Sequence, residues 1–195
     1  MLLSKAQSLA QQLLPAFNTT TGIPVSWVNL KNGRIAGDVE ETCVACAVTL
    51  AVEFRLLSHL TGNSIYGRKV DHAVSAIIAR REPNTHLVGN TLWTTTGEWE
   101  RRDAGIGAGA DSYYEYLLKT YLVFGDEAYL EMFVDQYASA QRHMAAHSTW
   151  HGFSWLLDIH MTKLSAIKGW VSSLSAFWPA LQVLTISQCC CLTVH

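Results

Sequence analysis

The spacing of apolar residues along the chain predicts a protein that is mostly helical. Leu2, Ala6, Leu9 and Leu13 recur every three or four residues, which places them on one face of a helix that ends at Pro15. Similar spacing and helix-capping residues predict five more helices. These cover about 42–60 and 64–81, and they begin at Asp111, near Asp126 and near Leu164.

Two stretches lack the helical pattern. Residues 18–41 contain Gly and Pro at intervals and predict a long loop. In residues 87–100, β-prone residues on both sides of Gly97 predict a small β-hairpin. Tight turns alternate with longer connections, as in stacked helical hairpins. The fold class we expect is therefore all-α, one domain with a small β-hairpin.

Composition excludes several classes of protein. Of the 195 residues, 49% are hydrophobic and only 15% are charged, against about 25% charged in average globular proteins. This balance excludes a disordered chain. A formal charge of −2 without a basic stripe excludes nucleic acid as a partner. So little charge predicts a wide apolar groove or association surface.

The amino-terminal segment and the apolar runs exclude two further features. No run reaches the roughly 20 uninterrupted apolar residues of a membrane helix. Polar residues between Ser4 and Gln12 interrupt any signal-peptide core, so we expect no signal peptide in this chain.

The stretch GIGAGADSYYEY, residues 105–116, is the most informative of the sequence. It matches a dinucleotide-binding pattern, but no apolar strand precedes it, which argues against a nucleotide site. Asp111 is placed to act as the N-cap of the helix that follows. Glu115 lies one turn further on the same face. Two carboxylates beside three tyrosines are typical of a sugar site, and paired carboxylates carry out glycoside hydrolysis.

A third acidic residue, Glu53, lies in the predicted helix 42–60, which is apolar nearly all round and should be buried. A buried carboxylate needs a partner. Either it forms a structural ion pair, near Arg55 or with an arginine of another helix, or it faces a polar cavity.

Other polar residues carry weaker signals. Cys43 and Cys46 fall inside the apolar helix, where the alternatives are buried thiols or a disulfide to a segment missing from this chain. The sequence gives no chemical role for the three consecutive cysteines Cys189, Cys190 and Cys191. Histidines recur every fourth residue from 143 to 151 without a zinc motif, as at a solvated helix end. Asn18-Thr19-Thr20 is a glycosylation sequon.

Several motifs together resemble glycoside hydrolase family 47, the inverting, calcium-dependent α-1,2-mannosidases. They are LLPAFNTTTGIP (13–24), VNLKNG (28–33), EFRLLSHLTG (53–62) and DSYYEYLLK (111–119). Three more are similar to the ER degradation-enhancing α-mannosidase-like branch of that family. They are ETC (41–43), GIGAG (105–109) and SAFWPALQVL (175–184).

The resemblance implies part of an (α/α)7 barrel of helical hairpins, with residues 1–184 a partial catalytic domain and 185–195 a divergent tail. It implies that Asp111 is a catalytic carboxylate and that Glu115 and Glu53 bind the mannose. The substrate implied is a high-mannose N-glycan on a misfolded glycoprotein, in the endoplasmic reticulum lumen or associated with its membrane. A redox partner there could act through Cys43 or Cys46.

The resemblance also implies that calcium is the cofactor and that its ligating threonine lies outside this chain. Two other essential carboxylates of the family lie outside it as well. Because an inverting glycosidase needs both an acid and a base, Asp111 by itself should not run the reaction. The alternative function is an inactive fragment that binds mannose-bearing glycans.

Overall fold

The computed structural model describes residues 1–33, 40–147 and 154–192. In chain order the elements are α1 (Leu2–Leu13), η1 (Leu14–Phe17), β1 (Glu41–Cys43), α2 (Val44–Val48), α3 (Ala51–Thr61), α4 (Ile65–Ile78), β2 (Thr91–Trp93), β3 (Trp99–Arg101), β4 (Asp103–Ala104), α5 (Asp111–Phe124), α6 (Glu127–Met144), β5 (Ala145–His147), β6 (Ser154–Leu156), β7 (Asp158–His160), β8 (Ala166–Lys168), η2 (Ser173–Phe177) and α7 (Trp178–Leu192).

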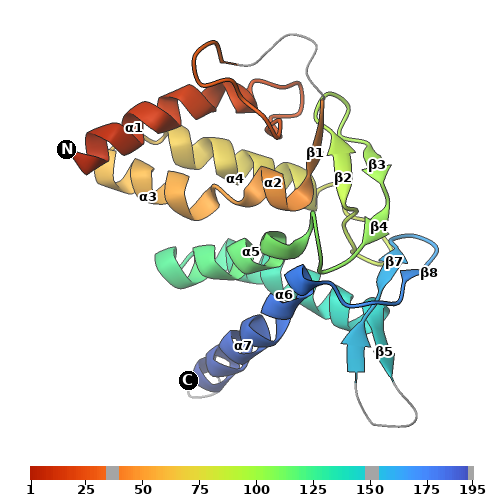
Figure 1. Ribbon diagram of the computed structural model, residues 1–195. Helices are drawn as coiled ribbons and strands as arrows, with labels where there is room; N and C mark the ends of the chain where they lie inside the picture. The colour runs from red at the N-terminus through yellow and green to blue at the C-terminus, as the bar shows by residue number, and fades with distance from the viewer. Residues whose placement is uncertain (34–39, 148–153, 193–195) are drawn as a thin grey trace.

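Helices gather on one side of the molecule and short strands on the other (Figure 1). The strands form small antiparallel sheets in the orders β1-β2-β3, β4-β7-β8 and β5-β6. Helices α2, α5 and α7 begin on the strand side, whereas α4 and α6 lead back to it (Figure 1). The α3–α4 and α5–α6 pairs are therefore helical hairpins whose strand-side ends share one region.

Four of the predicted helices are present. The first ends at Leu13, directly before the turn η1, whose second residue is Pro15, and the third corresponds to α4. Helix α5 begins at Asp111 as expected. Asp126 caps α6, because its side chain accepts a hydrogen bond from the Ala128 amide. The hairpin predicted over 87–100 is present as β2 and β3, which β1 extends.

The predicted helix 42–60 is wrong in its first part. Thr42 lies in β1, opposite Leu92, and a turn at Thr49 and Leu50 separates α2 from α3. Pairing with a distant strand outweighs the local helical pattern here. The segment Val44–Thr61 has the length and hydropathy of a membrane span, but its two helices pack against α4 and α5.

The helix predicted near Leu164 is also wrong. Leu164 has a φ of +56°, and its amide donates to the His160 carbonyl in the turn between β7 and β8. A left-handed residue in a tight turn cannot start a helix. The last helix instead begins at Trp178, after the turn η2.

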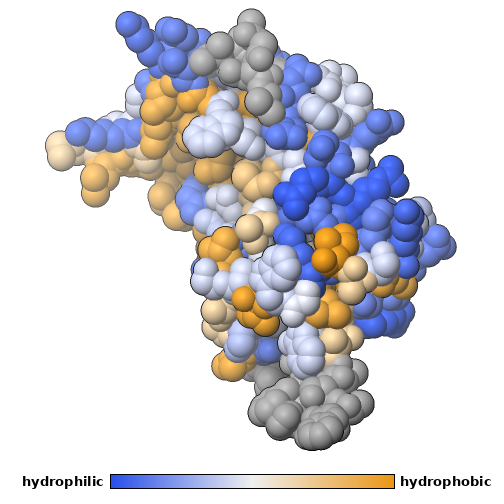
Figure 2. All heavy atoms as spheres, turned by 45° about the vertical axis from the view of Figure 1, so that its right-hand side comes forward, coloured by the Kyte–Doolittle hydropathy of each residue, from blue (hydrophilic) through white to orange (hydrophobic). Residues whose placement is uncertain are grey.

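The core runs from α1 to α7 and is rich in aromatic rings. Phe54 contacts Phe17 and Tyr66, and Trp178 contacts Tyr114 and stacks on the ring of Tyr137. Apolar residues also remain exposed over α1 and α3, and they line an open groove of about 490 Å³. They gather at the upper left of Figure 2, opposite the polar strand side. The apolar groove expected from the low charge is therefore present.

Candidate active site

The glycine-rich turn between β4 and α5 holds the start of α5. The amides of Ala110 and Asp111 both donate to the Gly107 carbonyl, at 3.0 and 2.9 Å. The Gly109 carbonyl accepts a hydrogen bond of 2.9 Å from the amide of Ala45 in α2. The turn is therefore fixed both to its own helix and to the first turn of α2.

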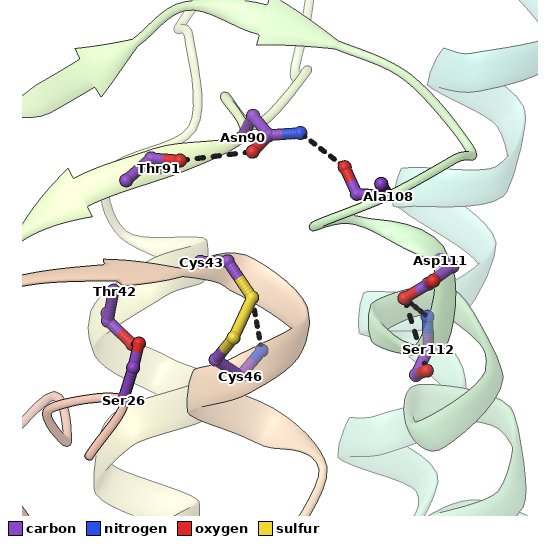
Figure 3. Close-up of a disulfide and its surroundings, with 9 residues drawn as sticks. All are labelled: Ser26, Thr42, Cys43, Cys46, Asn90, Thr91, Ala108, Asp111 and Ser112. Atoms are coloured by element: carbon purple, nitrogen blue, oxygen red, sulfur yellow. Dashed lines mark hydrogen bonds between the residues drawn. A yellow bond between two sulfur atoms is a disulfide. The ribbon is translucent and has the colours of Figure 1, made fainter. Parts of the chain in front are cut away.

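Asp111 is the first residue of α5, and the N-cap position belongs to Ala110. The predicted N-cap role of Asp111 is therefore wrong by one residue. Its Oδ1 accepts hydrogen bonds from the Ser112 amide at 2.6 Å and the Ser112 hydroxyl at 3.2 Å (Figure 3). A carboxylate at a helix N-terminus is stabilised by the helix dipole. Within the described residues no lysine or arginine pairs with Asp111, so its charge is not neutralised by a salt bridge.

Glu115 follows Asp111 by one turn of α5, as the sequence predicts. Its Oε1 lies 2.6 Å from the Nζ of Lys119, four residues on, and both side chains are partly exposed. An exposed pair of this spacing contributes only about 0.3–0.5 kcal/mol. Such a weak pair leaves Glu115 able to exchange Lys119 for a ligand hydroxyl.

Glu53 does not occupy the environment that the sequence predicts. Its side chain is exposed on α3, and its Oε1 accepts a 2.9 Å hydrogen bond from the Tyr116 hydroxyl of α5. The expected burial is wrong because the apolar residues of α3 are buried on one side and exposed on the other, where they line the groove. The ion-pair alternative is wrong as well, because Arg55 binds Asp71 and Asp126 and, among the described residues, no arginine of another helix pairs with Glu53.

The three acidic side chains are thus held by two neighbouring helices. Asp111 and Glu115 lie on α5, and Tyr116 of the same helix links Glu53 of α3 to them. Burial, the hydrogen bond to Glu53 and the negative charges of Glu53 and Glu115 raise the pKa of Tyr116 to about 12. Tyr116 therefore stays protonated and donates to Glu53 throughout the physiological range.

Replacing Glu53 with Gln is expected to lower the pKa of Tyr116 from about 12, because burial and the charge of Glu115 still raise it but the hydrogen bond to the Glu53 carboxylate and the charge of Glu53 are lost. A raised tyrosine pKa favours folding below pH 10, and that stability is lost as the pH rises through about 12. Between pH 10 and about 12 the variant should therefore lose less stability than the parent chain. At neutral pH the free energies of unfolding of the two should differ by no more than about 0.5 kcal/mol. NMR titration of ring-labelled tyrosine measures this pKa, and an unchanged value would contradict the assignment.

The two cysteines of the first helical turn are bonded to each other. Cys43 is the N-cap of α2, and its sulfur joins that of Cys46 (Figure 3). The predictions of buried thiols or of a disulfide to a missing segment are therefore wrong. The backbone of Cys43 is extended at the start of α2, and this brings its side chain close to that of Cys46, three residues further on. The side chains of Cys189, Cys190 and Cys191 lie outside the described residues.

The remaining polar candidates lie apart from this region. His143 is in α6 and His147 in β5, so the four-residue spacing does not follow one helix, and His151 lies outside the described residues. Asn18 is exposed just after η1, and its glycosylation stays a prediction. In the described ranges no three His, Cys, Asp or Glu side chains come together as metal ligands.

The sequence profile of "Glycosyl hydrolase family 47" matches residues 1–190. The chain belongs to this family. It is 42% identical to "ER degradation-enhancing alpha-mannosidase-like protein 3" of Xenopus laevis over 189 residues, which are 94% of this chain and 20% of that protein. It is 43% identical to "Alpha-mannosidase I MNS4" of Arabidopsis thaliana, covering 94% of this chain and 28% of the relative.

A solved structure has the same fold. The α-1,2-mannosidase from Trichoderma reesei matches 82% of this chain with a TM-score of 0.73 and 28% identity, over 34% of its own length. The expected fold class, part of an α/α barrel with a small hairpin, is confirmed. The chain spans between about a fifth and a third of the proteins it matches.

One residue of this region, Asn90, is not predicted from the sequence. It lies directly before β2, and its side-chain amide reaches the glycine-rich turn, donating to the Ala108 carbonyl at 2.8 Å. The only sequence signal was a polar residue that follows the apolar run Leu87-Val88-Gly89.

Proposed function

We propose that this chain contributes to the sugar site of an α-1,2-mannosidase of the ER degradation-enhancing branch. In this proposal Asp111 is the catalytic carboxylate. The observation that carries it is the Asp111 side chain at the start of α5, on a fixed glycine-rich turn and without a lysine or arginine partner among the described residues. A fixed carboxylate that no cation neutralises is available for proton transfer.

Glu115 and Glu53 bind hydroxyl groups of the terminal mannose in this proposal. Each is partly or fully exposed, and each has a partner that a sugar hydroxyl can replace. Tyr116 donates to Glu53 and orients it. Inverting hydrolysis uses a general acid and a general base about 6.5–9.5 Å apart. Asp111 supplies one of the two, and we place the second on another part of the barrel.

The substrate of the proposal is a high-mannose N-glycan of a misfolded glycoprotein in the endoplasmic reticulum. Its support is that the chain is similar to ER degradation-enhancing α-mannosidase-like proteins and to α-mannosidases. Residues 1–184 form the partial catalytic domain and 185–195 the divergent tail. A redox partner acting through Cys43 or Cys46 is part of the proposal, supported by the exposure of Cys46.

Calcium is the metal that the family implies. Calcium takes six to eight oxygen ligands, and the described residues bring no three candidate side chains together. They do not fit a calcium ion, and no step of the proposal uses one. We place its ligands on other parts of the barrel.

Binding without hydrolysis is the second candidate function. The observation that favours it is that two of the three predicted carboxylates, Glu115 and Glu53, have a partner that a sugar hydroxyl can replace, and that among the described residues only Asp111 of the three lacks a lysine or tyrosine partner, whereas inverting hydrolysis needs two acid–base groups. This leaves the site with sugar-binding groups and a single carboxylate poised for acid–base work.

The proposal is tested by titrating the chain with α-1,2-mannobiose, using maltose as the matched control. We expect saturable NMR shifts at Ser112 and Tyr116 with mannobiose, half complete at about 1 mM, because few side chains contact the sugar. Maltose should cause none. Equal shifts with both disaccharides, or none with either, would exclude a mannose site. Mannose appearing in the same tube would exclude the binding-only function.

A further inference from the structure

Asn90 is a buried polar residue that joins three separate segments. It is 7% exposed and lies between β2 and the glycine-rich turn. Its backbone carbonyl accepts a 2.9 Å hydrogen bond from the amide of Val44, and its own amide donates to the Arg101 carbonyl at 3.0 Å. Its side-chain Nδ2 donates to the Ala108 carbonyl at 2.8 Å, and its Oδ1 accepts from the Thr91 hydroxyl at 3.0 Å.

The side chain of Asn90 also fills the space beside Gly109. A Cβ atom on Gly109 would lie 2.5 Å from Oδ1 of Asn90, which is closer than real Cβ atoms approach. Gly109 has a φ of +90°, a conformation that side chains rarely adopt. Asn90 and Gly109 therefore form a matched pair, in which one residue supplies the side chain and the other leaves room for it.

Only an amide can make both side-chain contacts at position 90. The Ala108 carbonyl needs a donor and the Thr91 hydroxyl an acceptor. An ionised aspartate has no donor, and an aliphatic side chain has neither group. Because the site is buried, a carbonyl left without its donor would lose stability that water cannot fully restore.

The hydrogen bonds of Asn90 lead directly to Asp111. Ala108 lies inside the turn whose Gly107 carbonyl accepts the Asp111 amide, and Ala45, next to Val44, holds the Gly109 carbonyl. Figure 3 shows Asn90 above this turn, with Ala108 between it and the start of α5. Thus Asn90 links the strand β2 and the helix α2 to the turn that carries the carboxylate.

We propose that Asn90 is a positioning residue for Asp111. It fixes the glycine-rich turn so that the carboxylate stays at one place at the start of α5. The inference rests on the proposed function in so far as Asp111 acts on a sugar, but the fixing of the turn can be measured without any sugar.

The test is amide hydrogen exchange of the chain and of two variants. Asn90→Ala removes both side-chain hydrogen bonds, whereas Thr91→Val keeps the bond to Ala108 and removes the other. In Asn90→Ala we expect exchange of the Asp111 amide to rise about tenfold, the effect of one lost hydrogen bond on local opening. In the same variant, exchange of the Leu117 amide, inside α5, should stay within about twofold of its rate in the unaltered chain. In Thr91→Val the exchange rates of both amides should stay within about twofold of those in the unaltered chain.

Several results would overturn the proposal. Exchange at Asp111 that stays within about twofold in Asn90→Ala would show that the turn does not depend on Asn90. An equal rise at Asp111 and Leu117 would show a general loss of stability. If Asn90→Ala does not fold, Asn90→Asp, which keeps the size and the acceptor, gives the same comparison.

Binding of α-1,2-mannobiose separates this inference from the proposed function. We expect Asn90→Ala to weaken binding about tenfold and Thr91→Val to leave it unchanged, because only the first releases the turn. Mannobiose binding that Asn90→Ala leaves intact would overturn the positioning role. If the unaltered chain does not bind the sugar, the proposed function fails, and the exchange pattern still decides whether Asn90 positions the turn.

Discussion

Replacing Asp111 with Asn is expected to lower kcat for mannose release at least about a thousandfold, the scale seen when an acting residue of a hydrolase is removed. The amide keeps the size of the side chain and can accept the hydrogen bonds of Ser112, so α5 should still form. What is lost is the negative charge that takes or gives the proton. We therefore expect a large loss of rate with little loss of stability.

The measurement uses a chimera in which residues 1–184 replace the matching segment of the Trichoderma reesei α-1,2-mannosidase. Glu127→Gln is the matched control, since Glu127 is an exposed acidic residue in the first turn of the next helix, α6. Its rate should stay within about threefold of the parent. A rate for Asp111→Asn that is as close to the parent would mean that Asp111 only stabilises the helix.

Replacing Arg55 with Met is expected to destabilise the chain by about 2 kcal/mol. The guanidinium lies 2.8 Å from Asp71 and 2.6 Å from Asp126, and it lies over the rings of Phe124 and Tyr129. Burial opposes its charge, but the hydrogen bond to Asp126, the charge of Asp71 and the contact with Tyr129 together outweigh burial and raise the pKa of Arg55. The cost is moderate because both aspartates are partly exposed.

For a chain of this size, a loss of about 2 kcal/mol lowers the melting temperature by roughly 6 °C. Arg101→Met is the control, because the Arg101 side chain is 49% exposed and, within the described part of the chain, forms one ion pair, with Asp103. Its effect should stay within about 0.5 kcal/mol. Equal melting temperatures for the two variants would show that the Arg55 cluster does not join α3 to α4 and α6.

The sequence predicted secondary structure best where the residues that determine an element lie within it or directly beside it. Helices α5 and α6 have a helical apolar pattern, and they are separated by Gly125, with a φ of +66°, and by the capping Asp126. The sequence predicted less well where a residue far away in the chain determines the local structure. Thr42 is in a strand because Leu92 pairs with it, and no pattern near residue 42 shows this.

The candidate site shows the same division. Asp111 and Glu115 lie on one helix, so their spacing alone predicts that they are neighbours. The environment of Glu53 depends on Tyr116 from another helix, and that of the turn depends on Asn90 from a strand. These contacts require the fold and could not be read from local patterns.

In the proposed function the Asp111 region of this chain serves an inverting α-1,2-mannosidase. The most direct test is the chimera of residues 1–184 with the fungal enzyme, given α-1,2-mannobiose and followed by ¹H NMR at the anomeric protons. We expect the released mannose to appear first as the β anomer, because inversion at an α-linked sugar yields the β product. Mannose that appears first as the α anomer, or release no faster than by the chimera with Asp111→Asn, would contradict the proposed function.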